Sequence, residues 1–273
     1  MTLKDAQHIH FIGIGGIGVS ALAAMFLHEG KKVSGSDSQD SAILAHLGEL
    51  GATTFVGHDA AHIADGVDLV IYTIAAPEDN PERAEAHRRG ITELSYPEAL
   101  GVVSKEKYTI AVSGTHGKTT TTAMIAEILI AAQKEPTVVV GSILKSAGSN
   151  FVAGGGDYLV AEACEYRRSF LNLSPTVLVI TNIDADHLDY YKDLADIQKA
   201  FGEMVAKVPT DGFVICDPKD AKVAPALAGA AAKSIDYTSQ EVPELSFPGE
   251  HNVKNAQAAA AVAAAMPWTS PPP

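Results

Sequence analysis

Two glycine-rich loops constrain the fold of this chain more than any other feature of its sequence. The first, FIGIGGIGVS, spans Phe11–Ser20, and the second, SGTHGKTTTT, spans Ser113–Thr122. Each loop follows a short apolar run typical of a buried strand and precedes a stretch with helical spacing. A strand, a glycine loop and a helix in this order form the phosphate-binding turn of parallel α/β folds. The sequence therefore predicts two phosphate sites, and it raises the question of why one protein needs two.

The first loop carries the pattern G-x-G-x-x-G at Gly13, Gly15 and Gly18. Glycines permit the tight turn and let backbone N–H groups approach a pyrophosphate at the helix N-terminus. Asp37 ends the next predicted strand, about twenty residues on, where a carboxylate can bind a ribose hydroxyl. The motif indicates a dinucleotide such as NAD or a nucleotide-sugar, since both present a pyrophosphate and a ribose. The alternative is a glycine turn needed only for helix–sheet packing.

The second loop has the features of an ATP-binding P-loop. Lys118 follows Gly117 and precedes Thr119, so the lysine can reach the β and γ phosphates and the hydroxyl can bind Mg²⁺. The standard pattern has a glycine where this chain has Val112, and Gly114 stands two residues later instead. We predict ATP binding here. A dehydrogenase needs no P-loop, so the two loops favour ATP plus a separate nucleotide-linked substrate over an NAD-dependent oxidoreductase.

Acidic and histidine side chains follow two further predicted strands. Glu162 ends the apolar run at residues 157–163, and His187 lies in DADHLD, beyond the run at 175–184. Residues beyond the carboxyl ends of parallel strands line the ligand crevice of such folds. Because Mg²⁺ prefers a few carboxylates with phosphates and water, one carboxylate beside Thr119 is sufficient. We interpret Glu162 and His187 as metal-binding candidates; the alternative for His187 is a structural hydrogen bond in its turn.

Strand and helix patterns alternate on both sides of residue 105, which indicates an α/β fold. We expect strands at residues 8–14, 31–37, 67–73, 108–114, 136–142, 157–163, 175–184 and 212–217. We expect helices at residues 20–28, 41–50, 81–89, 118–132, 197–208 and 252–266. Polarity rises at Leu100–Lys107. We therefore predict a Rossmann-like parallel-sheet domain over residues 1–104, followed by a P-loop ATPase-type α/β central domain over residues 105–266.

Composition argues against several classes of partner. The formal net charge is −13, which opposes the counterion release that nucleic-acid binding needs and is repelled by anionic membranes. The two cysteines, Cys164 and Cys216, make no disulfide framework, and we interpret Cys164 as a small buried hydrophobe. No signal-peptide pattern opens the chain, and the apolar run at residues 256–266 is too short to span a bilayer. We expect a cytoplasmic protein with neither nucleic-acid nor membrane partners.

Several segments in a fixed order resemble one family, the Mur ligases. They are HFIGIGGIGVSALA, GSD, PEDNPE, SGTHGKTTTT, EACEYRRSFL, TNIDADHLDYY and GEHNVKNAQAAAAV, between residues 10 and 262. The combination is highly specific and covers nearly the whole chain. The opening HFIGIGGIG and the EACEY variant favour the members that join L-alanine to UDP-N-acetylmuramate over relatives that add later residues or recycle the tripeptide.

The resemblance implies a role for each residue at a matching position. The UDP-sugar would lie against Gly15, Gly16 and Gly18, with Ser36 and Asp37 near the uridine end. ATP would lie against Gly114, Thr115, His116, Gly117, Lys118, Thr119 and Thr120, with Asn252 and Asn255 at the adenine. Magnesium ions would be held by Thr119, Glu162 and His187, and the implied catalytic residues are Lys118, Glu162 and His187.

The implied reaction activates a carboxylate before an amine attacks it. An unactivated carboxylate is a poor electrophile, so the lactyl carboxylate of UDP-N-acetylmuramate would first become an acyl phosphate. The amine of L-alanine would then attack, giving an amide, ADP and phosphate, as a step in peptidoglycan precursor synthesis. Transfer of the γ-phosphoryl group depends mainly on charge neutralisation, which Lys118 and Mg²⁺ would supply.

The end of the sequence departs from the family pattern. Family members continue with a third domain that closes over ATP and holds the amino acid, whereas this sequence ends soon after HNVKN. We expect that C-terminal domain to be absent and residues 267–273 to be an aberrant tail. Back-translated and read one frame over, MPWTSPPP becomes Ala-Val-Asp-Ile-Pro, which predicts a frameshift. Two hypotheses stay open: a ligase, active or impaired by truncation, and a nucleotide-binding fragment or regulator without ligation.

Overall fold

The computed structural model describes residues 3–144, 149–246 and 248–266. The sequence-predicted tail at residues 267–273 lies outside them. The chain forms two compact units. Unit 1 comprises residues 1–102 and 141–153, and unit 2 comprises residues 103–140 and 154–273.

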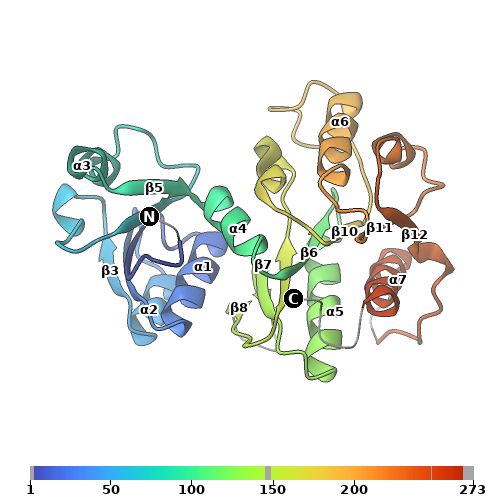
Figure 1. Ribbon diagram of the computed structural model, residues 1–273, viewed down its shortest axis with the longest axis horizontal. Coiled ribbons are helices and arrows are strands. Elements are labelled where there is room, and N and C mark those ends of the chain that lie inside the picture. Colours follow the sequence, from blue (N-terminus) through green and yellow to red (C-terminus); the bar gives the residue numbers. More distant parts are fainter. Residues whose placement is uncertain (1–2, 145–148, 247, 267–273) are drawn as a thin grey trace. The chain divides into compact units, whose positions relative to one another are not determined.

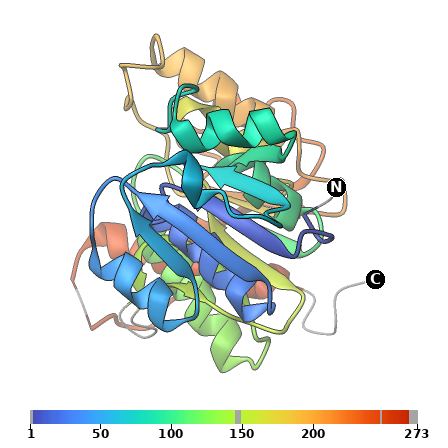
Figure 2. The same ribbon diagram turned by 90° about the vertical axis from the view of Figure 1, so that its left-hand side faces the viewer.

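Unit 1 contains a five-stranded parallel sheet with the strand order β3-β2-β1-β4-β5. The strands are β1 (His8–Ile12), β2 (Lys32–Asp37), β3 (Thr53–Val56), β4 (Leu69–Tyr72) and β5 (Thr92–Ser95). The helices are α1 (Ile17–His28), α2 (Ala42–Glu49), α3 (Pro81–Arg89) and α4 (Tyr96–Ser104), with the short turn η1 (Ala60–His62). Helices α1 and α2 cover one face of the sheet and α3 the other (Figures 1 and 2). The strand order reverses between β1 and β4, which is where ligands bind in open α/β sheets.

Helix α3 begins and ends at residues suited to those positions. The Asn80 side-chain oxygen accepts hydrogen bonds from the N–H groups of Glu82 and Arg83, at 2.9 and 3.2 Å. Pro81 occupies the first turn, where its missing N–H costs nothing, and Gly90 ends the helix with φ 67°. This cap places Glu82 in the first turn of α3 with its side chain buried against the sheet.

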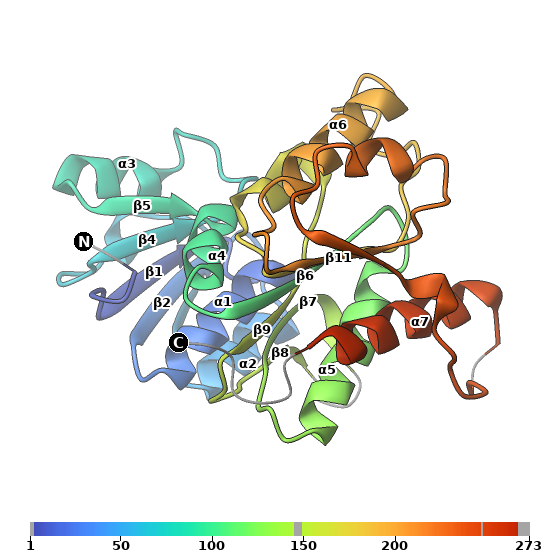
Figure 3. The same ribbon diagram turned by 45° about the vertical axis from the view of Figure 1, so that its right-hand side comes forward.

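A second sheet has the strand order β12-β11-β10-β6-β9-β7-β8, and unit 2 contains all of it except residues 141–144 and strand β8. The strands are β6 (Tyr108–Ser113), β7 (Thr137–Leu144), β8 (Ser149–Val152), β9 (Tyr158–Glu162), β10 (Val177–Ile180), β11 (Phe213–Cys216) and β12 (Lys233–Asp236). Helices α5 (Lys118–Ala131) and α7 (Glu250–Ala265) pack together on one face, and α6 (Leu194–Val205) lies on the other (Figures 1 and 3). All four residues of β10 are buried, as a central strand covered on both faces requires.

The segment at residues 141–153 belongs to unit 1, although the chain enters unit 2 at residue 103. Strand β8 packs against α1. The Asn150 amide donates to the Ser20 hydroxyl at 2.9 Å and to the Ile17 carbonyl, and Phe151 is buried. The chain therefore passes between the units three times, at residues 102–103, 140–141 and 153–154.

The α/β class and the parallel N-terminal sheet predicted from the sequence are confirmed, but four strands were missed. These are β3, β5, β8 and β12, and each lies at an edge of its sheet. Edge strands are exposed along one side; β3, β5 and β12 have no fully buried residue, so they lack the apolar run that marks a central strand. Helix α6 begins at Leu194, earlier than predicted, because the Asp193 side chain caps the Asp196 N–H at 2.9 Å.

Candidate nucleotide-binding sites

The first glycine loop connects β1 to α1 and is held by the end of β2. The N–H groups of Gly13 and Ile14 both donate to the Ser36 carbonyl oxygen, at 2.8 and 2.9 Å. Gly13 has φ 79°, a conformation that favours glycine. The Gly15 N–H donates to Asp37 Oδ2 at 2.9 Å. The turn is thus fixed to the two residues that end β2.

The glycines of this loop differ in how much space surrounds them. A Cβ atom at Gly15 would lie 2.8 Å from Leu44 Cδ1, and one at Gly18 would lie 2.7 Å from the Tyr96 ring. At Gly16 the nearest atom would be the Gly13 carbonyl oxygen, at 3.3 Å. Gly16 is exposed and is the N-cap of α1 without a side-chain cap. Backbone N–H groups at such a helix start are suited to an anion.

Ser36 and Asp37, the predicted uridine-side residues, both bind other protein groups. Asp37 holds the Gly15 N–H through one oxygen. Ser36 is fully buried, and its hydroxyl donates to Glu82 Oε2 at 2.6 Å. Direct contact of either residue with a ligand stays a prediction. The buried position of Ser36 indicates that its contribution is to hold the loop.

The second glycine loop connects β6 to α5 and has two left-handed glycines. Gly114 has φ 134° and Gly117 has φ 84°. A Cβ atom at Gly114 would lie 2.1 Å from Thr181 Oγ1, and one at Gly117 would lie 2.4 Å from Asn255 Oδ1. Only glycine fits both the backbone angles and the space. These close approaches join the loop to β10 and to α7.

Lys118, the first residue of α5, has its ammonium group fully used by the protein. Nζ lies 2.5 Å from the Gly114 carbonyl oxygen, 3.2 Å from that of Thr115 and 3.1 Å from Glu165 Oε1. An ammonium group has three N–H donors, so each has an acceptor here. The lysine must release at least one of them to bind a phosphate.

Glu165 belongs to this site, although the sequence reasoning did not select it. Its side chain is buried, and Oε1 lies 3.8 Å from His187 Nε2 as well as near Lys118. Oε2 is buried without a hydrogen-bond partner among the described residues. Buried carboxylate oxygens are normally paired, so this atom indicates a missing donor or cation. The signal available in the sequence was the second acidic residue of EACEY, three positions after Glu162.

The three predicted metal-binding residues form two groups: Thr119 bonds to Glu162, and His187 lies near Glu165. The Thr119 hydroxyl donates to Glu162 Oε2 at 3.0 Å, because the register of β6 and β9 pairs Val112 with Glu162 beside the loop. His187 is linked to Lys118 only through Glu165. Among the described residues, no three His, Cys, Asp or Glu side chains by themselves form a metal site. An ion here would need phosphate oxygens or water, as Mg²⁺ usually does.

Three of the five described non-glycine residues with positive φ lie near the same residues, and the other two, Gln133 and Glu135, follow α5. His187, Arg167 and Arg168 have φ values of 52°, 51° and 57° without being glycine. Each such residue costs on the order of 1–3 kcal/mol, and such residues cluster at functional sites. Arg168 is fixed by ion pairs to Asp196 and Glu203, at 2.9 and 2.8 Å.

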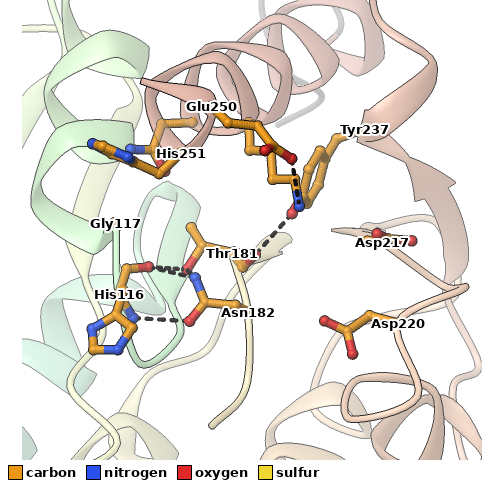
Figure 4. A pocket seen from close by; sticks show the side chains of 11 residues that line it. His116, Gly117, Thr181, Asn182, Asp217, Asp220, Tyr237, Glu250 and His251 are labelled. Atoms are coloured by element: carbon orange, nitrogen blue, oxygen red, sulfur yellow. Dashed lines mark hydrogen bonds and ion pairs between the residues drawn. The ribbon is translucent and has the colours of Figure 1, made fainter. Parts of the chain in front are cut away.

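A pocket of about 540 Å³ opens beside the second loop (Figure 4). It is lined by His116, Gly117, Thr181, Asn182, Asp217, Asp220, Tyr237, Glu250, His251, Lys254 and Asn255. His116 and Asn182 exchange hydrogen bonds, since the His116 N–H donates to Asn182 Oδ1 at 3.0 Å and the Asn182 amide donates to the His116 carbonyl at 2.9 Å. The Tyr237 hydroxyl donates to the Thr181 carbonyl at 2.8 Å.

The structure brings most predicted ATP-contacting residues together, with one exception. Thr115 is buried, Thr120 lies in the first turn of α5, and Asn255 lines the pocket. Asn252 is not among the lining residues, and its amide donates to the Pro248 carbonyl at 2.7 Å. Its predicted contact with adenine stays a prediction.

The two cysteines have opposite environments. Cys164 is exposed, so its interpretation as a buried hydrophobe was wrong; it follows β9 in the loop that carries Glu165. Cys216 ends β11 and is buried, and burial raises the pKa of its thiol to about 12.

Comparison with protein families agrees with the fold and the motifs. The model described as the Mur ligase family catalytic domain matches residues 8–108, and the Mur ligase middle domain matches residues 112–242. The chain belongs to the Mur ligase family. None of its described helices is long and apolar enough to cross a membrane.

Individual relatives narrow this likeness. A UDP-N-acetylmuramate–L-alanine ligase of Clostridium botulinum is 43% identical over 93% of this chain, and one of Syntrophus aciditrophicus is 42% identical over 98%. The chain spans 62% of the length of both. Among solved structures, a UDP-N-acetylmuramate–alanine ligase from Thermotoga maritima has a TM-score of 0.80 at 32% identity, covering 93% of this chain and 64% of that one. A UDP-N-acetylmuramate:L-alanyl-γ-D-glutamyl-meso-diaminopimelate ligase from Neisseria meningitides has a TM-score of 0.85 at 26% identity, covering 94% and 93%.

Proposed function

We propose that this chain carries the nucleotide-binding part of an ATP-dependent ligase that joins L-alanine to UDP-N-acetylmuramate. The observation that carries the proposal is the second loop, where Lys118 lies beside the Thr119–Glu162 pair and a pocket of about 540 Å³. A P-loop is used for phosphoryl transfer, which hydride-transfer enzymes do not need. The proposed reaction is a step of peptidoglycan precursor synthesis in the cytoplasm.

In the proposed reaction, one substrate gives a phosphoryl group and the other receives it. Unit 2 holds ATP, with its adenine in the pocket and its phosphates at the N–H groups and ammonium of the second loop. Lys118 neutralises charge on the phosphates, and the donors that face a phosphate in a dry site stabilise the charge that moves during transfer. Unit 1 holds the UDP-sugar at the first loop. The lactyl carboxylate of this sugar becomes an acyl phosphate before the amine of L-alanine attacks it.

The residues of unit 2 fit a magnesium ion. The Thr119 hydroxyl and a Glu162 carboxylate oxygen are 3.0 Å apart, and both are the hard oxygen donors that Mg²⁺ prefers. Glu165, whose Oε2 has no partner among the described residues, and His187 provide a second cation-attracting position. We propose that Thr119, Glu162 and His187 hold magnesium, which supplies neutralisation of phosphate charge when bound.

A second candidate function is nucleotide binding without ligation, as a fragment or regulator. The observation that favours it is length, because the chain spans only 62% of the ligases it matches. Positioning of reactants can contribute roughly 7–11 kcal/mol to catalysis. Part of that positioning is expected to come from the share of these ligases' length that the chain does not span.

Phosphate release from MgATP and UDP-N-acetylmuramate, with and without L-alanine, tests the proposal. Release that depends on L-alanine, with formation of the amide product, is expected from a ligase. Saturable binding of both nucleotides without such release would favour the second candidate. A chain that binds neither nucleotide would contradict both.

A further inference from the structure

A buried carboxylate lies in unit 1 beneath the first glycine loop, and the proposed reaction does not use it. Glu82 has no exposed surface. Its Oε2 accepts from the Ser36 hydroxyl at 2.6 Å and lies 3.0 Å from His58 Nδ1. Its Oε1 lies 2.8 Å from His62 Nδ1 and 3.6 Å from His10 Nε2. Side chains from β1, β2, η1 and the loop before η1 therefore converge on one residue of α3.

This arrangement stabilises the ionised form of a carboxylate that has no exposed surface. Burial by itself would raise the pKa of Glu82, but the nearby His10 ring and the hydrogen bonds with Ser36 and His62 outweigh burial and lower the pKa to about 2. The first turn of a helix also favours a negative charge. Both carboxylate oxygens have hydrogen-bond partners, whereas His10 Nε2, 3.6 Å from Oε1, is buried without one among the described residues. A fully paired buried charge of this kind fixes its partners in one geometry.

Ser36 connects the cluster to the glycine loop. Its side chain binds Glu82, while its carbonyl oxygen accepts both the Gly13 and the Ile14 N–H. The next residue, Asp37, holds the Gly15 N–H. One residue of β2 therefore transmits the position of the buried carboxylate to the turn that is proposed to receive a diphosphate.

We propose that Glu82 is a positioning residue for nucleotide binding in unit 1: through Ser36 it sets the geometry in which the turn at Gly13–Gly15 receives the diphosphate of a nucleotide. Glu82 itself does not contact that ligand, because the Glu82 side chain has no exposed surface. The inference rests on the proposed function, which assigns the UDP-linked substrate to this loop.

The alternative reading of such a histidine cluster is a metal site, and the distances argue against it. His58 and His62 lie 3.0 and 2.8 Å from Glu82 oxygens, which are hydrogen-bond distances. Among the residues that the structure describes, no group of His, Cys, Asp and Glu forms a metal site. The hydrogen bonds of the cluster fix the side chains of Ser36, His58 and His62 around the carboxylate.

The test compares Glu82→Gln with Glu85→Gln in the full chain. Glu85 lies on the same helix, and its carboxylate accepts hydrogen bonds from Arg88 and Arg89 of that helix and not from Ser36, so it is a matched control. The probe is UDP, with an ATP analogue as a check on unit 2. We expect roughly tenfold weaker UDP binding for Glu82→Gln, with ATP-analogue binding unchanged, as loss of one charged hydrogen-bond hub predicts.

The sign of the change separates positioning from simple electrostatics. UDP is an anion, so removing a nearby negative charge would leave its affinity unchanged or increase it. A decrease therefore has to come from altered loop geometry. Unchanged or tighter UDP binding by a folded Glu82→Gln chain would overturn the inference.

A second measurement does not depend on ligand binding. In ¹⁵N-labelled chain, Glu82→Gln is expected to shift the amide resonances of Gly13, Ile14 and Gly15, whereas Glu85→Gln leaves them in place. If wild-type chain does not bind UDP, the proposed function fails, while the amide shifts still decide the present inference. Unmoved amides overturn it in every case.

Ser36→Ala provides the same tests if Glu82→Gln does not fold. This variant breaks the connection to the loop and leaves the carboxylate with its histidines. The same loop amides are expected to shift, and UDP binding is expected to weaken. A Ser36→Ala chain with wild-type loop resonances and wild-type UDP affinity would overturn the inference.

Discussion

The two glycine loops use the same strand–turn–helix geometry but differ in where they place charge. The first loop has no lysine, and the side chains that hold it are Asp37 and, through Ser36, the buried Glu82. The second loop starts its helix with Lys118 and has Glu162 and Glu165 beside it. Backbone N–H groups are sufficient to hold a phosphate, whereas transfer of a phosphoryl group needs positively charged groups placed to neutralise the charge that develops. The comparison supports the proposal that the first loop only binds its ligand, whereas the second takes part in the reaction.

The buried acids show the same difference. Both Glu82 oxygens have hydrogen-bond partners from unit 1. Glu165 has one oxygen with a partner, Lys118, and one oxygen with none among the described residues. An incomplete buried hydrogen-bond network is costly unless something completes it. The carboxylate oxygen without a partner among the described residues is the one beside the proposed site of chemistry.

Replacing a glycine in each loop is expected to give the largest difference. Gly114→Ala places a Cβ atom 2.1 Å from Thr181 Oγ1 at φ 134°, so we expect unit 2 to lose about 4 kcal/mol of unfolding free energy. Gly16→Ala meets nothing closer than 3.3 Å at φ −66°, and we expect a loss under about 1 kcal/mol. Urea unfolding of both variants measures this. Equal losses would mean that the loops do not differ in backbone constraint.

Low pH is expected to reduce the stability of unit 1 through protonation of Glu82. The pKa of Glu82 is lowered from 4.5 to about 2 in the folded chain. A lowered folded-state pKa contributes stability above pH 4.5 that is lost as the pH falls toward 2. The full contribution is about 3 kcal/mol, since each pKa unit corresponds to about 1.4 kcal/mol. The stability difference between wild type and Glu82→Gln should therefore shrink as the pH falls through this range; a difference independent of pH would contradict the assignment.

Removing the lysine is expected to separate the two loops functionally. Lys118→Ala should weaken ATP binding roughly 100-fold, because a charged hydrogen bond to phosphate is lost. UDP binding by unit 1 should not change. Lys199→Ala, an exposed lysine on α6, is the control. Isothermal titration with each nucleotide measures both affinities, and a parallel loss of UDP binding would show that the loops are not independent.

Glu165→Gln is expected to have the smallest effect, and in the opposite direction. The carboxylate competes with phosphate for Lys118, since all three ammonium donors are occupied. Without metal, in EDTA, the variant should bind ATP roughly three- to tenfold more tightly, because a competing negative charge is removed. Weaker metal-free binding would instead mean that Glu165 orients Lys118 toward the phosphate.

Sequence reasoning predicted the parts of the fold that depend on local pattern. Central strands such as β1 and β10 are buried on both faces, so their apolar runs were visible. The edge strands were not, because β3, β5 and β12 contain no fully buried residue. The membership of residues 141–153 in unit 1 depends on long-range packing against α1, which no local pattern encodes.

The candidate sites divide in the same way. Lys118, Thr119 and Glu162 were selected from motif and strand position, and the structure brings them together. Glu82 and Glu165 were not selected, because a buried acid is recognised only once its partners are known. Glu82 in particular gathers partners up to 72 positions away in sequence, from His10 onward. The sequence placed side by side the residues that belong to a contiguous motif or to a strand end, and it missed those whose position depends on burial.

The return of the chain to unit 1 has a consequence for its synthesis. Unit 1 includes residues 141–153, whose Asn150 binds α1, so it lacks part of its packing until that segment has left the ribosome. By then residues 103–140, including β6 and α5, have emerged as well. Domains that are contiguous in sequence fold one after the other during translation. Here unit 1 cannot complete its packing before residues 103–140 of unit 2 have been synthesised. We therefore expect the folding of the two units to overlap in time.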